Sequence, residues 1–240
     1  MSNFTTWRSL VDGEEIGEIP DSAIHHWPMD EGSGSSVEDV IGSADGSLNG
    51  PSWISNNWEG GYALEGDGVD DYVETTTWGD FGSNLDGEFA VALTIEPYTT
   101  FSSTTPLIGA DDVTFRISFS DVGAGSGELE YFSRDGSGDD INVATTDRYD
   151  DGTRHRVVIN KTGNDANDVR IWVDNSDVDQ TVSADDNPTN YSNFSEEVWF
   201  HGRSGDGRID YEGVIDNVVV YDSSLSNSEI EKDYNAQPWT

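Results

Sequence analysis

Apolar residues alternate with polar or small residues along several short stretches of this chain. Residues 88–96 show the pattern most clearly, with one face formed by Phe89, Val91, Leu93 and Ile95. A period of two residues indicates a strand with one face in a core and one face in water. Similar runs, separated by Gly, Asp, Asn and Ser, predict strands at 23–29, 62–66, 70–75, 88–96, 113–120, 127–133, 141–146, 153–161, 168–174, 197–202 and 213–221. Many short strands joined by turns predict an all-β fold, a sandwich of two antiparallel sheets.

The chain divides near its N-terminus. Residues 1–22 carry scattered apolar side chains between acids and predict an arm, which precedes one β domain at residues 23–240. The arm either docks on a partner or neighbouring subunit or is disordered. A single helix is predicted at residues 226–234, because Ser226 can cap it and Glu229 follows three positions later. The acidic stretches predicted to be flexible loops are 121–126, 135–140 and 175–195.

Acidic residues outnumber basic ones by 48 to 11, and the formal net charge is −37. This charge excludes nucleic acid as a partner, because each phosphate would meet a negative surface. The acids are spread along the whole chain, and at about 1 M salt a Debye length of about 3 Å screens their repulsion. We therefore predict adaptation to molar salt. A calcium-rich acidic shell and chance acidity are the alternatives.

Other classes of protein are excluded by what the sequence lacks. There is no Cys, so disulfides, thiol catalysis and Cys-ligated metals are excluded. No apolar run reaches the length of about 18 residues that a membrane span requires, and no span is predicted. The first residues also lack the basic start and apolar centre of a secretory signal.

Eight short motifs follow one another between residues 23 and 235. They are HWPMDEGSG at 26–34, VIGSADGSLNG at 40–50, YALEGDGVDDYV at 62–73, FAVALTIEP at 89–97, GTRHRVVI at 152–159, VRIWVDN at 169–175, FHGR at 200–203, and YEGVIDNVVVYD with LSNSEI at 211–222 and 225–230. In this order they resemble the laminin-G-like jelly-roll domains of the concanavalin A-like lectin/glucanase superfamily. The resemblance implies a jelly-roll β-sandwich. Arg154 and Arg156 depart from it, because they stand where the family pattern has Trp and His.

Asp216 is an acid inside an apolar stretch, and a buried carboxylate needs a partner. The resemblance implies a structural Ca²⁺ held by Asp216 together with Asp30 or nearby carbonyls. Hard oxygen ligands suit Ca²⁺. The alternative is a structural acid that is hydrogen-bonded or paired with a base.

The fold and its aromatic residues predict glycan binding, because sugars stack on exposed rings and bond to Asp, Asn and backbone amides. The candidates in loop-like stretches are Trp53, Trp58, Trp78, Tyr98, Tyr149 and Tyr191. The alternative is that most of these rings cap the core. Trp27, Trp172 and Trp199 are expected in the core or on a sheet face.

No enzymatic activity is predicted. The glucanases of the superfamily carry three acids spaced E-x-D-x-x-E, whereas Glu128 and Glu130 are followed here by Phe132 and Ser133. Neither an HExxH helix nor a G-x-S-x-G turn occurs. Pairs of carboxylates are frequent, but at this acid density they carry no information.

Two classes of function remain. The first is a non-catalytic structural or surface-display protein of a halophilic virus particle, such as a capsid decoration, turret or tail component, which binds host glycans. The second is an extracellular carbohydrate-binding or adhesion module of a halophilic archaeon. The isolated module, the missing export signal and the apolar arm favour the first, and both place the protein on a virion or cell surface at high salt. The arm residues Trp7, Leu10 and Val11 are predicted to dock on other virion or surface proteins and to form a homo-oligomer, with a trimer favoured.

Overall fold

The computed structural model describes residues 10–11, 14–15, 19–55, 61–75, 78, 85–110, 114–120, 126–189, 191, 198–202 and 211–237. Near the N-terminus, β1 (Leu10–Val11) pairs with β2 (Glu14–Glu15) as a small antiparallel ribbon. No helix in the described ranges is both long and apolar enough to cross a membrane.

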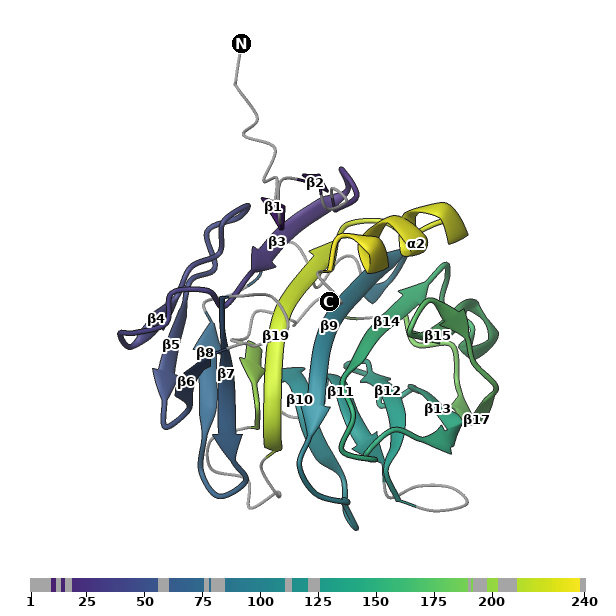
Figure 1. Ribbon diagram of the computed structural model, residues 1–240. Coiled ribbons are helices and arrows are strands. Elements are labelled where there is room, and N and C mark those ends of the chain that lie inside the picture. Colours follow the sequence, from purple (N-terminus) through teal and green to yellow (C-terminus); the bar gives the residue numbers. More distant parts are fainter. Residues whose placement is uncertain are drawn as a thin grey trace.

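Two antiparallel sheets form a sandwich (Figure 1). The nine-stranded sheet has the order β17 (Gln180–Asp185), β13 (Asp140–Arg148), β12 (Glu128–Arg134), β11 (Phe115–Ser120), β10 (Thr105–Ala110), β18 (Val198–Phe200), β8 (Tyr72–Thr75), β5 (Gly46–Asn49) and β4 (Ser36–Val37). The eight-stranded sheet has the order β16 (Ser176–Asp177), β15 (Val169–Val173), β14 (His155–Lys161), β9 (Phe89–Pro97), β19 (Glu212–Tyr221), β7 (Tyr62–Asp67) and β6 (Ser52–Ser55), with β3 (Ala23–Trp27) also paired to β19. The predicted jelly-roll architecture is confirmed.

The core lies between the two sheets and contains the apolar face of each alternating strand. Leu93 of β9, Ile117 of β11 and Ile171 of β15 belong to one buried cluster. Trp27 sits in the same cluster, 5.1 Å from the ring of Phe200 and nearly edge-on to it. The alternation read from the sequence therefore gives the correct inward face of these strands.

The predicted helix is present as α2 (Asn227–Asn235). Ser226 and Glu229 form the expected capping box at its start. Ile230 on this helix packs with Ala92 and Val219, which lie on the outer face of the eight-stranded sheet. One end of that outer face is therefore covered by α2 and removed from water (Figure 1).

The structure corrects the prediction that residues 175–195 form a flexible loop. Both β16 and β17 fall within this stretch, and β17 pairs with β13 at the edge of the nine-stranded sheet. Its six residues are exposed or half-buried, and only Val182 and Ala184 among them are apolar, so no extended alternation marks it. The sequence prediction also missed β10, because its six residues are all buried and include Pro106 and Gly109. It also missed the short strands β1, β2, β4, β5 and β6.

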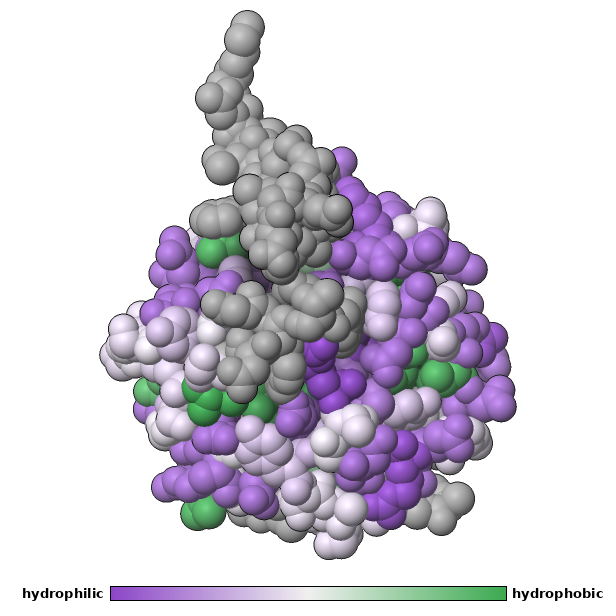
Figure 2. All heavy atoms as spheres, viewed as in Figure 1, coloured by the Kyte–Doolittle hydropathy of each residue, from purple (hydrophilic) through white to green (hydrophobic). Residues whose placement is uncertain are grey.

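Hydrophilic residues cover most of the face seen in Figure 2, and hydrophobic ones form only small separate patches. In the part of the chain that the structure describes, eight acids are nevertheless buried: Asp39, Asp71, Glu128, Glu130, Asp135, Asp150, Asp216 and Asp233. Of the two acids predicted to hold Ca²⁺, Asp216 is therefore one of several buried acids, and Asp30 is exposed. Most of these buried acids accept hydrogen bonds from the backbone or from a base, so they are part of the fold.

We expect the melting temperature to rise steeply between dilute buffer and molar KCl. The physical reason is the net charge of −37, which repels itself across a surface with few bases until salt screens it. Calorimetry at a series of KCl concentrations measures the effect. A melting temperature that does not depend on salt would contradict adaptation to molar salt.

Candidate functional site

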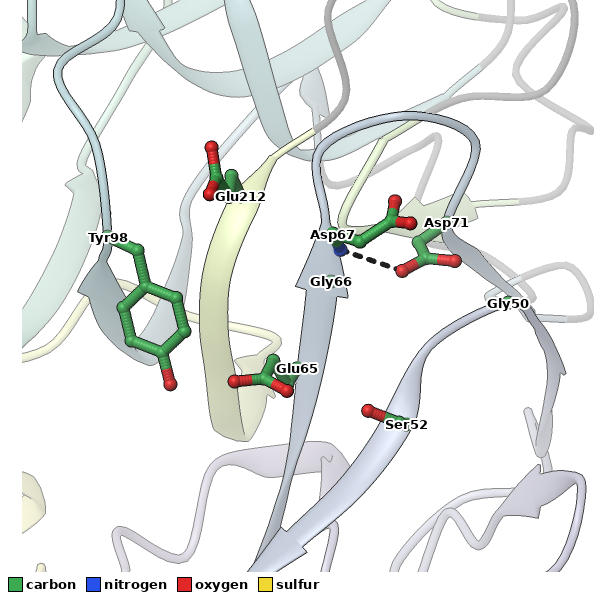
Figure 3. Close-up of a pocket in the computed structure, with 8 residues that line it drawn as sticks. All are labelled: Gly50, Ser52, Glu65, Gly66, Asp67, Asp71, Tyr98 and Glu212. Carbon is green, nitrogen blue, oxygen red and sulfur yellow. Dashed lines mark hydrogen bonds between the residues drawn. The ribbon is translucent and has the colours of Figure 1, made fainter.

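A hollow of about 370 Å³ opens on the outer face of the eight-stranded sheet, away from α2. Its lining residues are Gly50, Ser52, Glu65, Gly66, Asp67, Asp71, Tyr98 and Glu212. Tyr98 lies on one side of the hollow and Asp71 on the other, with three carboxylate side chains between them (Figure 3). The Tyr98 side chain is 47% exposed. Few other large hydrophobic side chains among the described residues are as open to solvent. We call this hollow the Tyr98 pocket.

Strand register explains why these distant residues meet. Val214 of β19 faces Glu96 on β9 and Glu65 on β7, so these three side chains share one outward-facing row. One step further, Glu212 faces Asp67, and its carbonyl accepts a hydrogen bond of 3.1 Å from the Tyr98 backbone N–H. The pocket therefore forms where β9 ends, β19 begins and β7 ends.

The turn between β7 and β8 forms the far wall of the pocket. The backbone N–H of Asp67 donates to the Asp71 carboxylate at 2.7 Å, and the Val69 N–H donates to Asp67 at 2.9 Å. Gly50 approaches so closely that a Cβ there would clash with Asp71 Oδ1. Carboxylate oxygens of Asp67, Asp70 and Asp71 all lie within 4.8 Å of one another.

The electrostatics of the pocket are one-sided. Four of the lining side chains are carboxylates, and none is basic. Burial raises the pKa of Tyr98 to about 12, and the carboxylates of Glu65 and Glu96 add to the shift. Burial also raises the pKa of Asp71, and the neighbouring charges of Asp67 and Asp70 contribute. The Tyr98 hydroxyl is therefore a neutral donor at all ordinary pH values, next to acceptors that suit hydroxyl groups.

Of the aromatic residues predicted to bind glycan, the structure brings only Tyr98 to the described pocket. Trp78 is 1% exposed and packs 5.2 Å from Trp27, and its Nε1 donates to Thr75 Oγ1. Tyr191 is 2% exposed and bonds to Ser133. The prediction is wrong for these two rings, because both fill the core.

The remaining aromatic candidates lie elsewhere. Trp53 is half-buried on β6, and its Nε1 donates to the Gly34 carbonyl at 3.1 Å. Tyr149 is half-buried and meets His155 edge-on at 5.3 Å. Trp58 lies outside the described residues. Trp27, Trp172 and Trp199 occupy the core or a sheet face, as predicted.

The two residues predicted to hold Ca²⁺ occupy different environments. Asp30 is exposed and accepts the Tyr62 backbone N–H at 3.1 Å. Asp216 is fully buried at a bulge of β19, where its Oδ1 accepts the Asn217 N–H. It lies in the same cross-strand row as Thr94 and Arg156, so a base is placed near it. A Ca²⁺ ion held by Asp30 and Asp216 stays a prediction.

The predicted assembly residues cannot be placed in full. Trp7 lies outside the described residues, and Leu10 and Val11 are described only through the backbone pairing of β1. Docking through the arm therefore stays a prediction. Sedimentation in molar KCl measures it: the full chain is expected to sediment as a trimer and a chain lacking residues 1–22 as a monomer. A monomer in both cases would contradict the prediction.

Most of the pocket residues were missed in the sequence. Ser52, Glu65, Asp67 and Glu212 look like ordinary surface positions in a chain with 48 acids. Only the pairing of β6, β7 and β19 brings them together. The one usable signal was the Asp-Gly turn at Asp67, which predicts a tight turn but no ligand.

Residues 67–231 match the family described as the concanavalin A-like lectin/glucanases superfamily, and the chain belongs to it. A search of curated proteins finds no match. The predicted resemblance is thus confirmed at the level of the superfamily and its laminin-G-like branch.

Three solved structures illustrate the similarity of fold. Domain 4 of AbnA, a GH43 extracellular arabinanase from Geobacillus stearothermophilus in complex with arabinotriose, has a TM-score of 0.63 and 18% identity, over 90% of this chain and 98% of that one. Trypanosoma rangeli sialidase in complex with sialic acid has a TM-score of 0.65 and 16% identity, over 96% of this chain and 36% of that one. The binding domain of Paraclostridial Mosquitocidal Protein 1 has a TM-score of 0.68 and 12% identity, over 90% of this chain and 52% of that one. The chain therefore spans about a third of the sialidase and nearly all of the arabinanase domain, and the likeness is one of fold.

Proposed function

We propose that this protein is a non-catalytic glycan-binding module whose ligand is a neutral sugar held in the Tyr98 pocket. The observation that carries the proposal is an exposed aromatic ring beside a hollow lined with hydroxyl-accepting carboxylates. The sugar stacks on the Tyr98 ring, and its hydroxyls donate to Glu65, Asp67 and Glu212. Membership of a lectin-like superfamily and the arabinotriose complex of the AbnA domain support this function.

The charge of the pocket defines the class of sugar. An acidic sugar would place its carboxylate among four others with no base to pair with. Direct hydrogen bonds to a neutral sugar need no such pairing and persist in molar salt. We therefore infer that neutral glycans bind and sialylated glycans do not.

The open geometry supports binding without catalysis. Asp67, Tyr98 and Glu212 are all exposed, so water has access to the pocket. Enzymes stabilise the charge that develops in a transition state best where water is excluded. Release of reducing sugar from a bound neutral glycan would contradict a non-catalytic role.

The expected effect of Tyr98→Ala is a loss of affinity for neutral glycan of about tenfold, because the stacking ring is removed. Glycan arrays followed by calorimetric titration in molar KCl measure it. Tyr62→Ala is the matched control, since Tyr62 is 42% exposed but lies outside the pocket. Equal losses in both variants, or no binding by the folded wild-type protein, would contradict the proposal.

The proposal also includes the place where the protein works. We infer display on a virion or cell surface at high salt, because the charge of −37 suits that medium. A virion location predicts that the protein co-purifies with particles banded in molar salt. Its recovery only in the cell or the medium would favour the adhesion module.

A further inference from the structure

A row of side chains crosses the outer face of the nine-stranded sheet, on the opposite side of the sandwich from the Tyr98 pocket. Strand register places in line Glu74, Trp199, Gly109, Arg116, Phe132 and Asn142. Neighbouring strands lie about 4.8 Å apart, so the part from Trp199 to Asn142 spans about 19 Å. Arg116, Phe132 and Asn142 are largely buried, with exposed fractions of 9%, 7% and 8%.

A buried carboxylate holds two of these side chains in place. Glu130 is fully buried, and its Oε2 accepts hydrogen bonds from Arg116 Nη2 and Ser118 Oγ, both at 2.9 Å. Its Oε1 accepts a hydrogen bond of 2.6 Å from Asn142 Nδ2. The Arg116 Nε donates in addition to Ser118 Oγ at 3.1 Å. Arg116 and Asn142 are therefore fixed on either side of Phe132 before any ligand arrives.

Each of these two side chains keeps one polar atom without a partner. Asn142 Oδ1 is buried and accepts no hydrogen bond. The amide cannot be turned round to relieve this, because Nδ2 must face the Glu130 carboxylate. Within the described ranges, the hydrogen bonds of Arg116 come from Nε and Nη2, and Nη1 has no partner. Nearly all buried polar atoms in proteins are paired, so a buried acceptor without a partner calls for an explanation.

Phe132 lies on the strand between the two that carry these atoms. The Arg116 guanidinium lies 4.7 Å from the centre of the Phe132 ring. Gly109 separates Arg116 from Trp199 and carries no side chain, and a Cβ there would meet only the Phe115 carbonyl oxygen, at 3.5 Å. No side chain therefore stands between Arg116 and Trp199 along this row.

We propose that the row binds the acetamido group of an N-acetylated sugar. The carbonyl accepts from Arg116 Nη1, the N–H donates to Asn142 Oδ1, and the methyl group packs near Phe132. In a trans amide the carbonyl and the N–H point in opposite directions, which matches a donor on β11 and an acceptor on β13 with β12 between them. Two neighbouring hydroxyls of a plain sugar do not have this opposed arrangement.

Binding in molar KCl of triacetylchitotriose and cellotriose tests the proposal, because these sugars differ in their acetamido groups. We expect triacetylchitotriose to bind the wild-type protein about tenfold more tightly. Arg116→Lys should abolish this preference, since it keeps the charge near Glu130 but removes the forked donor. Asn142→Ser is a second variant, which keeps a small polar group and removes the orphaned acceptor.

Arg134→Lys is the matched control, because Arg134 also lies over Phe132, at 5.3 Å, but is paired with Asp140 at the surface. It should leave the preference intact, as should Tyr98→Ala, whose site is on the other sheet. Equal binding of the two sugars, a preference that survives Arg116→Lys and Asn142→Ser, or its loss in Tyr98→Ala would each overturn the proposal. Equal binding of trialanine, which offers peptide amides without a sugar, would overturn the assignment to a glycan.

Discussion

Replacing Asp233 by Ala is expected to lower the free energy of unfolding by about 3–5 kcal/mol. Asp233 lies on α2 and accepts hydrogen bonds of 2.8 Å from both Nε and Nη2 of Arg156 on β14. Side-chain exposure is 1% for Arg156 and 0% for Asp233. The substitution leaves the guanidinium buried without its counter-charge, and the Tyr221 hydroxyl loses the same acceptor.

Urea unfolding at constant molar KCl measures the effect, with Asp140→Ala as the control. Asp140 pairs with Arg134, which is 45% exposed, so its loss is expected to change the free energy of unfolding by no more than about 1 kcal/mol. The double variant Arg156→Leu with Asp233→Leu should recover part of the loss, because no unpaired charge remains. Equal effects of Asp233→Ala and Asp140→Ala would contradict this role of the ion pair.

This ion pair also explains the departure of Arg156 from the family pattern. Besides Asp233, the guanidinium donates to the Asn217 carbonyl at 2.6 Å, at the bulge of β19. Asn217 in turn bonds to His26 and to Gln237 beyond the end of α2. A forked cation can join the helix to the sheet at several acceptors at once, which a histidine could not do.

Acidification from pH 6.5 to pH 4.5 is expected to lower the stability of the wild-type protein relative to His201→Asn by about 2 kcal/mol. His201 is fully buried, and burial lowers its pKa to about 3. Between pH 6.5 and pH 3 the unfolded chain therefore binds a proton that the folded protein does not, so stability falls as the pH falls. Asn suits the position because the backbone φ is +68° there.

The comparison with His201→Asn isolates this effect from other titrations. For Asp39, burial is outweighed by hydrogen bonds from His25 and from backbone N–H groups, which lower its pKa to about 2, below the range tested. The raised pKa of His155, which burial opposes but Asp174 and Asp151 outweigh, contributes stability that is fully present below pH 6.5. Urea unfolding at pH 6.5, 5.5 and 4.5 supplies the data. A difference between the two proteins that stays constant with pH would contradict a neutral buried His201.

Much of the fold follows from local patterns in the sequence. The stretch predicted at residues 88–96 is β9, because alternation of apolar residues is a property of neighbouring positions. The helix after Ser226 is likewise set by its own first residues. Strand β17 could not be found in this way, because an edge strand that is exposed on both faces needs no regular alternation of apolar residues.

The candidate site could not be predicted in the same way. Tyr98, Glu65 and Glu212 meet only through the register of three strands, and nothing in the spacing of these residues reveals that register. Trp78 and Tyr191 failed as candidates for the opposite reason. Both residues lie in stretches that look like loops in the sequence. In the folded protein both rings are buried, and the polar atom of each has a hydrogen-bond partner in the core.

The central claim is that a neutral glycan binds in the Tyr98 pocket. A crystal structure of the protein grown in molar salt with the best neutral ligand from the arrays tests it most directly. We predict density for a sugar ring stacked on Tyr98, with hydroxyls within hydrogen-bond distance of Glu65, Asp67 or Glu212. A sugar at full occupancy elsewhere on the protein, with only water in the Tyr98 pocket, would contradict the claim.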